Sequence, residues 1–336
     1  MRIWFNHWFS TVYHLINLIK DGDPGKFTII GSNENTLSVY KNACDEWYQE
    51  PYGIPSEQYI EFCLDFCQKH NIDIFVPRKE IVAISHAHKQ FETIGVKLLD
   101  DADYDMISLL EDKAATYKFF EKYVSECIPT VKIAHSMSEF LQFYFELLKS
   151  VPRVCYKLVE DEGARSFRVI DERIETSDAL LEKPGAKITL NAAIKVLSGY
   201  DFSIPVLLMP YLSGVEVSVD CLKTPNGNMI IPRYKTNKRY SEIIFKESLM
   251  NTCSCMMDAM GLEMPLNIQF KVESGKYYLL EVNPRMSGGL QLSCEATGIN
   301  LPSIAVNKLL GITKKWEYPQ NKTRKVVHIE TPICLD

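Results

Sequence analysis

Four polar residues in the last third of the chain have the types and spacing to bind a metal ion and a phosphate group. Glu281 and Asn283 are two positions apart at the end of an apolar run, so in a strand both side chains project from one face. Gln269 lies in the preceding apolar run, and Arg285 comes two positions after Asn283. Carboxylate and amide oxygens suit Mg²⁺, and a guanidinium can hold phosphate in a fork. The alternative is that Glu281 and Arg285 pair with each other at an exposed strand end.

The two apolar runs predict a β-hairpin. They span Leu266–Val272 and Tyr277–Val282, and the turn between them, residues 273–276, contains a glycine. A connection with an odd number of residues places Gln269 directly opposite Glu281, which brings a carboxylate and two amide oxygens together. A two-residue connection sends Gln269 to the other face.

The first hundred residues alternate strand and helix patterns, which predicts a parallel, doubly wound α/β sheet. The expected strands are Ile3–Phe5, Phe27–Gly31, Ile72–Val76 and Val96–Leu99, and the expected helices are Thr11–Lys20, Ser56–His70 and Ile81–Ile94. Residues 6–10 come after the first strand without a glycine, so we expect no dinucleotide at this sheet. Ligands of such sheets lie beyond the carboxyl ends of the strands, which makes His7, Ser10 and the turn 77–80 candidate substrate contacts. Ordinary loop and helix-capping residues are the alternative.

From Asp105 the pattern changes to that of an α+β unit. The expected strands are Val131–Ala134, Arg153–Val159, Phe167–Ile170, Val206–Met209, Val215–Cys221 and Met229–Arg233. The expected helices are Tyr104–Tyr123, Met137–Lys149, Leu190–Leu197 and Ser241–Met260. We find no internal repeat.

The hairpin and the segment after it resemble the ATP-grasp superfamily, particularly the large subunit of carbamoyl-phosphate synthetase and its shorter relatives. The resemblance rests on residues 267–270 (NIQF), 280–285 (LEVNPR), 287–289 (SGG) and 296–299 (ATGI). It implies that Gln269, Glu281 and Asn283 bind the metal ions that bridge the phosphates of ATP. It implies that Arg285 contacts the transferred phosphate or an acyl phosphate.

Further residues match the phosphate-binding positions of that family. Asp112-Lys113 resembles the start of its ATP-binding unit, which implies that Lys113 reaches the phosphates; taken alone, Lys113 is a surface lysine. Lys157 matches a strand lysine that precedes a loop over the phosphates. That loop is usually rich in glycine, whereas residues 161–166 (DEGARS) hold one, and Arg165 or Ser166 would compensate.

The segment 206–216 (VLLMPYLSGVE) looks like the adenine hinge of the family. The resemblance implies that backbone groups near Tyr211 and Leu212 bind the adenine edge and that Glu216 binds the ribose hydroxyls. Met209 falls where many relatives have an acidic residue. The catalytic candidates beside Arg285 are two basic residues, Lys235 and Arg239, which lie where relatives place basic residues near the phosphate or substrate.

The implied molecule has a Rossmann-like pre-ATP-grasp domain, residues 1–104, and a two-lobed ATP-grasp domain, residues 105–336. A mobile lid covers about 124–205, and ATP would lie between the lid and the larger lobe. The resemblance ends near Gly311, which leaves the last 25 residues unassigned.

Composition narrows the class of partner. The net charge is −6 and the pI about 5.7, and no basic stripe suggests nucleic acid. No run reaches the roughly 18 apolar residues of a membrane span. The ten cysteines are scattered without paired metal-ligand spacing, which fits a reducing, cytoplasmic compartment.

The expected function is that of an ADP-forming carboxylate–amine (or thiol) ligase that acts through an acyl phosphate. It would use ATP with Mg²⁺, or with Mn²⁺ as the alternative ion, on a small carboxylate and an amine. A homodimer, the commonest kind of oligomer, is one option for its assembly. Two other functions compete: a kinase or carbamate-phosphorylating enzyme with the same ATP site, and a non-catalytic ATP-binding regulatory module. Neither substrate can be identified from these residues.

Overall fold

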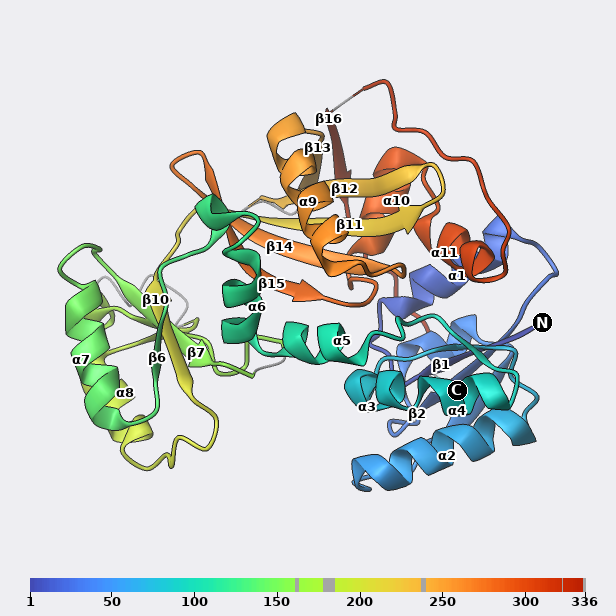
Figure 1. Ribbon diagram of the computed structural model, residues 1–336, viewed down its shortest axis with the longest axis horizontal. Coiled ribbons are helices and arrows are strands. Elements are labelled where there is room, and N and C mark those ends of the chain that lie inside the picture. Colours follow the sequence, from blue (N-terminus) through green and yellow to red (C-terminus); the bar gives the residue numbers. More distant parts are fainter. Residues whose placement is uncertain (161–162, 178–184, 237–239, 322, 335–336) are drawn as a thin grey trace. The chain divides into compact units, whose positions relative to one another are not determined.

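The computed structural model describes residues 1–160, 163–177, 185–236, 240–321 and 323–334 (Figure 1). The chain forms two compact units. The first comprises Met1–Leu110, Val215–Phe270 and Leu280–Asp336, and the second comprises Glu111–Gly214 and Lys271–Leu279. Both units are therefore discontinuous in sequence.

The first unit contains the predicted parallel sheet, with strand order β3-β2-β1-β4-β5. The strands are β1 (Arg2–Asn6), β2 (Thr28–Asn33), β3 (Glu46–Gln49), β4 (Ile74–Val76) and β5 (Lys97–Leu98). Its helices are α1 (Val12–Gly22), α2 (Ser56–Lys69), α3 (Ile81–His86) and α4 (His88–Thr93), with the 3₁₀ helix η1 (Val39–Ala43). The sequence patterns missed β3, because it lies at the sheet edge and its residues EWYQ, three half-buried and one exposed, form no apolar run.

The first unit also contains most of a six-stranded sheet, with order β15-β14-β11-β12-β13-β16. The strands are β11 (Val215–Thr224), β12 (Gly227–Lys235), β13 (Tyr240–Ile244), β14 (Leu266–Glu273), β15 (Lys276–Asn283) and β16 (Thr323–Val327). The helices α9 (Glu247–Met260), α10 (Leu290–Thr297) and α11 (Leu301–Leu309) accompany it.

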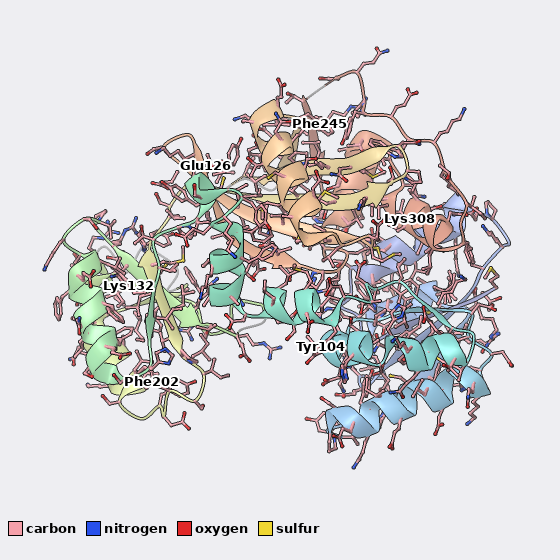
Figure 2. The ribbon with its side chains drawn as sticks, viewed as in Figure 1. Tyr104, Glu126, Lys132, Phe202, Phe245 and Lys308 are labelled. Atoms are coloured by element: carbon pink, nitrogen blue, oxygen red, sulfur yellow. The ribbon has the colours of Figure 1, made fainter. Side chains whose placement is uncertain are left out.

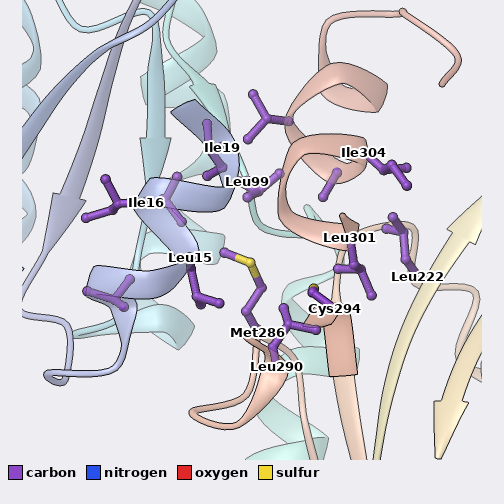
Figure 3. Close-up of a cluster of buried hydrophobic side chains, with 14 of the residues drawn as sticks. Leu15, Ile16, Ile19, Leu99, Leu222, Met286, Leu290, Cys294, Leu301 and Ile304 are labelled. Atoms are coloured by element: carbon purple, nitrogen blue, oxygen red, sulfur yellow. The ribbon is translucent and has the colours of Figure 1, made fainter. Parts of the chain in front are cut away.

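One hydrophobic core joins distant parts of the chain within this unit (Figure 3). Leu15, Ile16 and Ile19 of α1 are buried with Leu290 of α10 and Ile304 of α11. Apolar residues recur along α1 at helical spacing, so one face of the helix is buried. The same core takes in Leu222 of β11 and Met286, which immediately follows the metal-binding motif of the sequence analysis.

The second unit is a five-stranded sheet of order β6-β10-β7-β8-β9 with helices on one face. Its strands are β6 (Lys132–Ala134), β7 (Val154–Leu158), β8 (Arg168–Ile170), β9 (Lys187–Ile188) and β10 (Val206–Pro210). Its helices are α6 (Lys113–Phe120), α7 (Met137–Leu147) and α8 (Leu190–Leu197), with 3₁₀ turns η2 (Ser125–Cys127) and η3 (Glu172–Glu175). Lys132 of β6, labelled in Figure 2, pairs with Glu146 of α7 at 2.6 Å. The helices α7 and α8 bury their apolar faces against alternate residues of β7 and β10.

The long helix expected over Tyr104–Tyr123 was wrong, because the chain leaves helical geometry at Asp112. It forms α5 (Tyr104–Glu111) and then α6, with Asp112 extended at φ −87° and ψ 109°. The Asp112 carboxylate accepts hydrogen bonds from the amides of Ala114 and Ala115, so it caps α6. The cap therefore separates two helices at a place where the apolar periodicity of the sequence continues without a break.

The helix expected over Ser241–Met260 begins too early. Residues of β13 alternate between buried and half-buried, and Ser241 and Ile243 face inward between β12 and β16. The expected helix over Ile81–Ile94 is divided at Ala87 into α3 and α4, and nothing in the side chains explains the break. The patterns also missed α11, β9 and β16, the last of which lies in the unassigned C-terminal segment.

Among the described residues, no helix is long and apolar enough to cross a membrane. The cysteines form no disulfide; seven of the ten are buried, Cys44 is partly buried, and Cys255 and Cys334 are exposed.

Candidate functional site

The motif residues on β15 and just after it form a hydrogen-bonded chain. Asn283 Nδ2 donates to Glu281 Oε1 at 3.1 Å, and Arg285 Nη2 donates to Asn283 Oδ1 at 3.2 Å. On β14, Gln269 Nε2 donates to Asn267 Oδ1 at 3.3 Å, which leaves Oε1 as the acceptor that a metal would use. The alternative of a direct Glu281–Arg285 pair is not the arrangement found, because Asn283 lies between the two charges.

The hairpin connection has two residues. Ser274 and Gly275 separate β14 from β15 and have φ angles of 51° and 79°, as a type I′ turn requires. A regular two-residue hairpin would send Gln269 to the other face. However, Leu279 and Val282 on β15 are both buried, a spacing of three where an unbroken strand alternates at two. The burial of β15 therefore does not follow the two-residue alternation of a regular strand. That Gln269 joins Glu281 stays a prediction.

Polar residues continue across β11 and β12 in register. Glu216 lies opposite Lys235, and their side chains form an ion pair. The next pair on the same face is Ser218 and Arg233, with a hydrogen bond of 3.2 Å from Arg233 Nη2 to Ser218 Oγ. Two predicted site residues, Glu216 and Lys235, are thus brought together. Arg233 is the first residue of the short basic stretch 233–240, which the sequence alone predicts to be either a solvated turn or a contact for a small anion such as phosphate.

Buried Asp220 joins this sheet to the turn after the motif. Its Oδ1 accepts from Ser287 at 2.6 Å and from Asn267 at 3.0 Å, and its Oδ2 accepts from Ser293 at 2.6 Å. A buried carboxylate needs such donors, since an unpaired buried charge is costly. The network fixes the start of α10 against β11 and β14. In the sequence, only the presence of polar residues in otherwise apolar strands indicates this network, and that indication is weak.

The loop after β1 packs on the same turn. The ring of Phe9 has the Arg285 guanidinium at 5.9 Å and the Arg78 guanidinium at 5.7 Å from its centroid. A Cβ at Gly288 would stand 3.3 Å from both the Phe9 ring and Thr11 Oγ1. The first-strand loop, expected to contact substrate, therefore packs against the arginine expected to contact phosphate.

The carboxyl end of the parallel sheet carries a second polar cluster. His7 follows β1 with a φ of 43°, a strained conformation for a residue other than glycine. Its amide donates to Oε1 of buried Glu50 at 2.8 Å, and the same carboxyl group accepts from Ser32 and Tyr59. Burial raises the pKa of Glu50 above its usual value, although these donors oppose the shift. Burial also lowers the pKa of His7.

In the second unit, both predicted phosphate-binding lysines lie at the end of β7. Lys157 is on β7 opposite Leu207, on the face away from α7 and α8. Buried Lys113, the first residue of α6, donates to the Val159 carbonyl oxygen at 3.5 Å. Ser166 Oγ accepts from the Leu158 amide at 2.9 Å, which holds the loop against the residue after Lys157.

The predicted adenine hinge follows β10. Met209 is buried and pairs with Cys155, and the Tyr211 amide donates to the Arg153 carbonyl at 2.9 Å. The Tyr211 N–H is therefore occupied, whereas its ring has the Arg153 guanidinium at 4.6 Å from the centroid. The Arg165 carbonyl accepts from Arg168. Arg239 lies outside the described residues.

The predicted metal set consists of one carboxylate and two side-chain amides. Its oxygens suit Mg²⁺, which takes few protein ligands and keeps sites for water and phosphate. No group of three or more His, Cys, Asp or Glu among the described residues could hold a metal. The predicted set contains only one residue of these four types, so it is a different kind of group.

Comparison with known proteins identifies the fold and shows which proteins the chain resembles. A family model described as "ATP-grasp in the biosynthetic pathway with Ter operon" matches residues 203–332. The chain is 22% identical over 334 residues to the carbamoyl phosphate synthase large chain of Clostridium acetobutylicum, covering 92% of this chain and 28% of that one. It is 24% identical over 305 residues to an arginine-specific large chain from Halalkalibacterium halodurans, covering 85% and 26%. The chain thus spans little more than a quarter of the length of these relatives.

Solved structures of the same fold come from several enzymes. An ADP complex of N5-carboxyaminoimidazole ribonucleotide synthetase matches with a TM-score of 0.67 at 11% identity, over 93% of this chain and 77% of that one. The biotin carboxylase domain dimer of Hydrogenobacter thermophilus 2-oxoglutarate carboxylase, with MgADP and bicarbonate, matches with a TM-score of 0.66 at 15% identity, over 94% and 71%. An L-amino acid ligase from Bacillus licheniformis matches with a TM-score of 0.64 at 14% identity, over 92% and 74%.

The architecture is that of the ATP-grasp fold, with mixed α/β units. Within this fold, residues 203–332 match an ATP-grasp family model, and the chain is similar to part of the carbamoyl phosphate synthase large chain.

Proposed function

We propose that this chain is an ADP-forming ligase that activates a substrate carboxylate as an acyl phosphate and passes it to an amine or a thiol. The observation that carries the proposal is the hydrogen-bonded chain Glu281–Asn283–Arg285, which puts oxygen ligands for a metal next to a guanidinium. Support for the nucleotide comes from the family match and from structural neighbours that bind ADP or MgADP.

The reaction has two steps. A carboxylate oxygen of the substrate attacks the γ-phosphorus of ATP, and the bond from that phosphorus to the bridging oxygen of ADP breaks. The nitrogen of the amine then attacks the carbonyl carbon, phosphate leaves with the electron pair of the C–O bond, and the nitrogen loses a proton. Phosphoryl transfer of this kind needs mainly positioning and charge neutralisation.

Each candidate residue has a role in these two steps. Glu281 and Asn283, with Gln269, would hold Mg²⁺, which neutralises charge between the phosphates of the nucleotide. Arg285 holds the transferred phosphate, as a fork-shaped donor can. Lys113 and Lys157 bind the phosphate chain. Glu216 binds the ribose, and its ion pair with Lys235 fixes the carboxylate for that contact.

Fewer backbone amides of the hinge are available to the adenine edge than the resemblance alone implies. Since the Tyr211 amide already donates to Arg153, the Leu212 amide is the donor proposed for the adenine edge. Ser166 Oγ accepts a hydrogen bond from the Leu158 amide and so holds the loop beside Lys157. In this proposal, Ser166 compensates for the glycines that the loop lacks.

The test is the release of ADP and AMP from MgATP with a pooled library of amino acids and small carboxylates. A ligase releases ADP only when carboxylate and nucleophile are both present, and dividing the pool identifies them. ADP release with a single acceptor would identify a kinase or carbamate-phosphorylating enzyme instead. AMP would identify adenylation, and tight ATP binding without turnover a regulatory module; either result overturns the proposal.

A further inference from the structure

His7 belongs to a loop that borders Arg285. Its neighbour Trp8 and Pro77, which follows β4, line one small cavity together with Arg285. Two residues after His7, the ring of Phe9 has its centroid 5.9 Å from the Arg285 guanidinium. The carboxyl ends of β1 and β4 therefore lie beside the arginine that is proposed to hold the transferred phosphate.

The backbone of His7 is held in a conformation that few side chains adopt. Its φ is 43°, and its amide donates to Oε1 of buried Glu50 at 2.8 Å and to the Ser32 carbonyl oxygen at 2.8 Å. Glu50 is itself fixed, because it also accepts from Ser32 Oγ at 2.8 Å and from the Tyr59 hydroxyl at 2.7 Å. Backbone strain that the surroundings hold in place in this way is concentrated at functional sites.

The imidazole of His7 has one enclosed nitrogen and one open nitrogen. Nδ1 is buried, has no hydrogen-bond partner among the described residues, and lies 3.8 Å from Glu50 Oε2. Nε2 is not enclosed in this way, forms no hydrogen bond with a described residue, and belongs to a side chain that is 37% exposed. Nδ1 can therefore carry the hydrogen of the neutral ring toward Glu50, while Nε2 presents its lone pair outward.

The surroundings of the ring favour its neutral form. Burial lowers the pKa of His7; the Glu34 carboxylate opposes this shift, and the cations Lys79 and Arg78 add to it. Glu34 forms an ion pair with Lys79, so these two charges partly cancel. A neutral imidazole accepts a proton, whereas an imidazolium cannot.

We propose that His7 is the general base of the second step, accepting a proton from the attacking amine at Nε2, and that Glu50 is its positioning residue. An N–H bond of the amine breaks, its electron pair stays on the nitrogen that bonds to the carbonyl carbon, and the proton leaves His7 for solvent after product release. The need for a base rests on the proposed function. The choice of His7 rests on its open Nε2 and on the position of its loop beside Arg285.

The test compares two nucleophiles on the whole chain with MgATP and the pooled carboxylates. Hydroxylamine captures an acyl phosphate as a hydroxamate, and its weakly basic nitrogen loses a proton to water without a base from the enzyme. His7→Asn should lower amine-dependent ADP release by about 10²–10⁴-fold and keep hydroxamate formation near the wild-type rate. Asparagine tolerates a positive φ, so the variant should fold. His14→Asn removes an exposed histidine of α1 and should keep both rates.

The pH profile of the wild type is a second measurement, and it decides the case in which His7→Asn does not fold. Expressed per concentration of unprotonated amine, the rate should fall as the pH drops through the pKa of His7, because the imidazolium cannot accept the proton. A rate that stays constant through this range would overturn the base.

Two results with His7→Asn would also overturn the base. An equal loss of both rates would show that His7 only shapes the site, and an unchanged amine rate would exclude it from the reaction. Failure of the wild type to form a hydroxamate would instead overturn the acyl phosphate, and with it the step that His7 serves. The failure of this inference and the failure of the proposed function are therefore distinguishable.

Discussion

Asn283 donates from Nδ2 to Oε1 of Glu281 at 3.1 Å, so the two side chains share one face of β15 and hold each other in place. This arrangement leaves the second carboxylate oxygen of Glu281 for a metal. The negative charge of Glu281 is the only formal charge in the predicted ligand set. A substitution that removes this charge therefore tests the metal site.

Glu281→Gln should reduce metal-dependent ADP release by on the order of 10²–10³-fold, because a neutral amide binds Mg²⁺ and offsets its charge less well. The variant is nearly isosteric, so its thermal midpoint should stay near that of the wild type. Glu295→Gln, at an exposed position on α10, is the matched control and should keep full activity. Turnover of Glu281→Gln at the wild-type rate would remove Glu281 from the metal site.

Lys157→Ala should weaken ATP binding by roughly 10–100-fold, which is the contribution of one charge-assisted hydrogen bond. Calorimetric titration with ATP and Mg²⁺ measures the change. Lys195→Ala on α8 removes an exposed lysine of the same unit and should leave the affinity unchanged. Equal affinities for wild type and Lys157→Ala would exclude this lysine from nucleotide binding.

Asp112→Ala should destabilise the protein by about 1 kcal/mol, since α6 loses its cap, and should also weaken ATP binding because Lys113 is the first residue of α6. Denaturant unfolding and ATP titration measure the two effects. Thr189→Ala removes the comparable cap of α8 and should cost similar stability with no effect on ATP. If both variants bind ATP as the wild type does, the cap serves stability alone.

Phe9→Leu should lower kcat/KM for the second substrate by about 2–30-fold, because the leucine fills the space without the cation–π contacts to Arg78 and Arg285. The substrates found by the ADP screen allow this measurement. An unchanged kcat/KM would show that the Phe9 ring only packs.

Glu50→Gln should make stability less dependent on pH. The folded-state pKa of Glu50 is raised by burial, so the folded protein favours the protonated form, and wild-type stability from this group falls as pH rises from the unfolded pKa through the folded one. The variant should therefore be more stable than the wild type at neutral pH, and the gain should shrink as the solution becomes acidic. Exposed Glu57→Gln should show no such trend.

Much of the fold could be predicted because local patterns carry it. The β-α-β alternation, the hairpin and helices such as α8 followed from periodicity and turn residues. Asp112 and Ala87 interrupt helices without interrupting the apolar pattern, so those breaks could not be read from periodicity. The strand β13 was taken for helix because its pairing with β12 and β16 depends on residues far along the chain.

Some residues of the candidate site could likewise be predicted from local spacing, and others could not. Glu281, Asn283 and Arg285 are near neighbours in sequence, so their spacing predicted a common face. The Arg233 guanidinium reaches Gly289 only through tertiary packing, so this contact could not be predicted from spacing along the chain. The occupied amide of Tyr211 likewise depends on Arg153, on another strand.

The shared core of the first unit has a consequence for synthesis of the protein on the ribosome. Asn300 Nδ2 donates to the Leu18 carbonyl across 282 residues, and Leu15, Ile16 and Ile19 are buried by helices of the same late segment. The parallel sheet therefore emerges long before the residues that cover α1 exist. High sequence separation of this kind slows folding and leaves apolar surface open to aggregation. The nascent chain should accordingly depend on chaperone binding at α1 until α11 has been made.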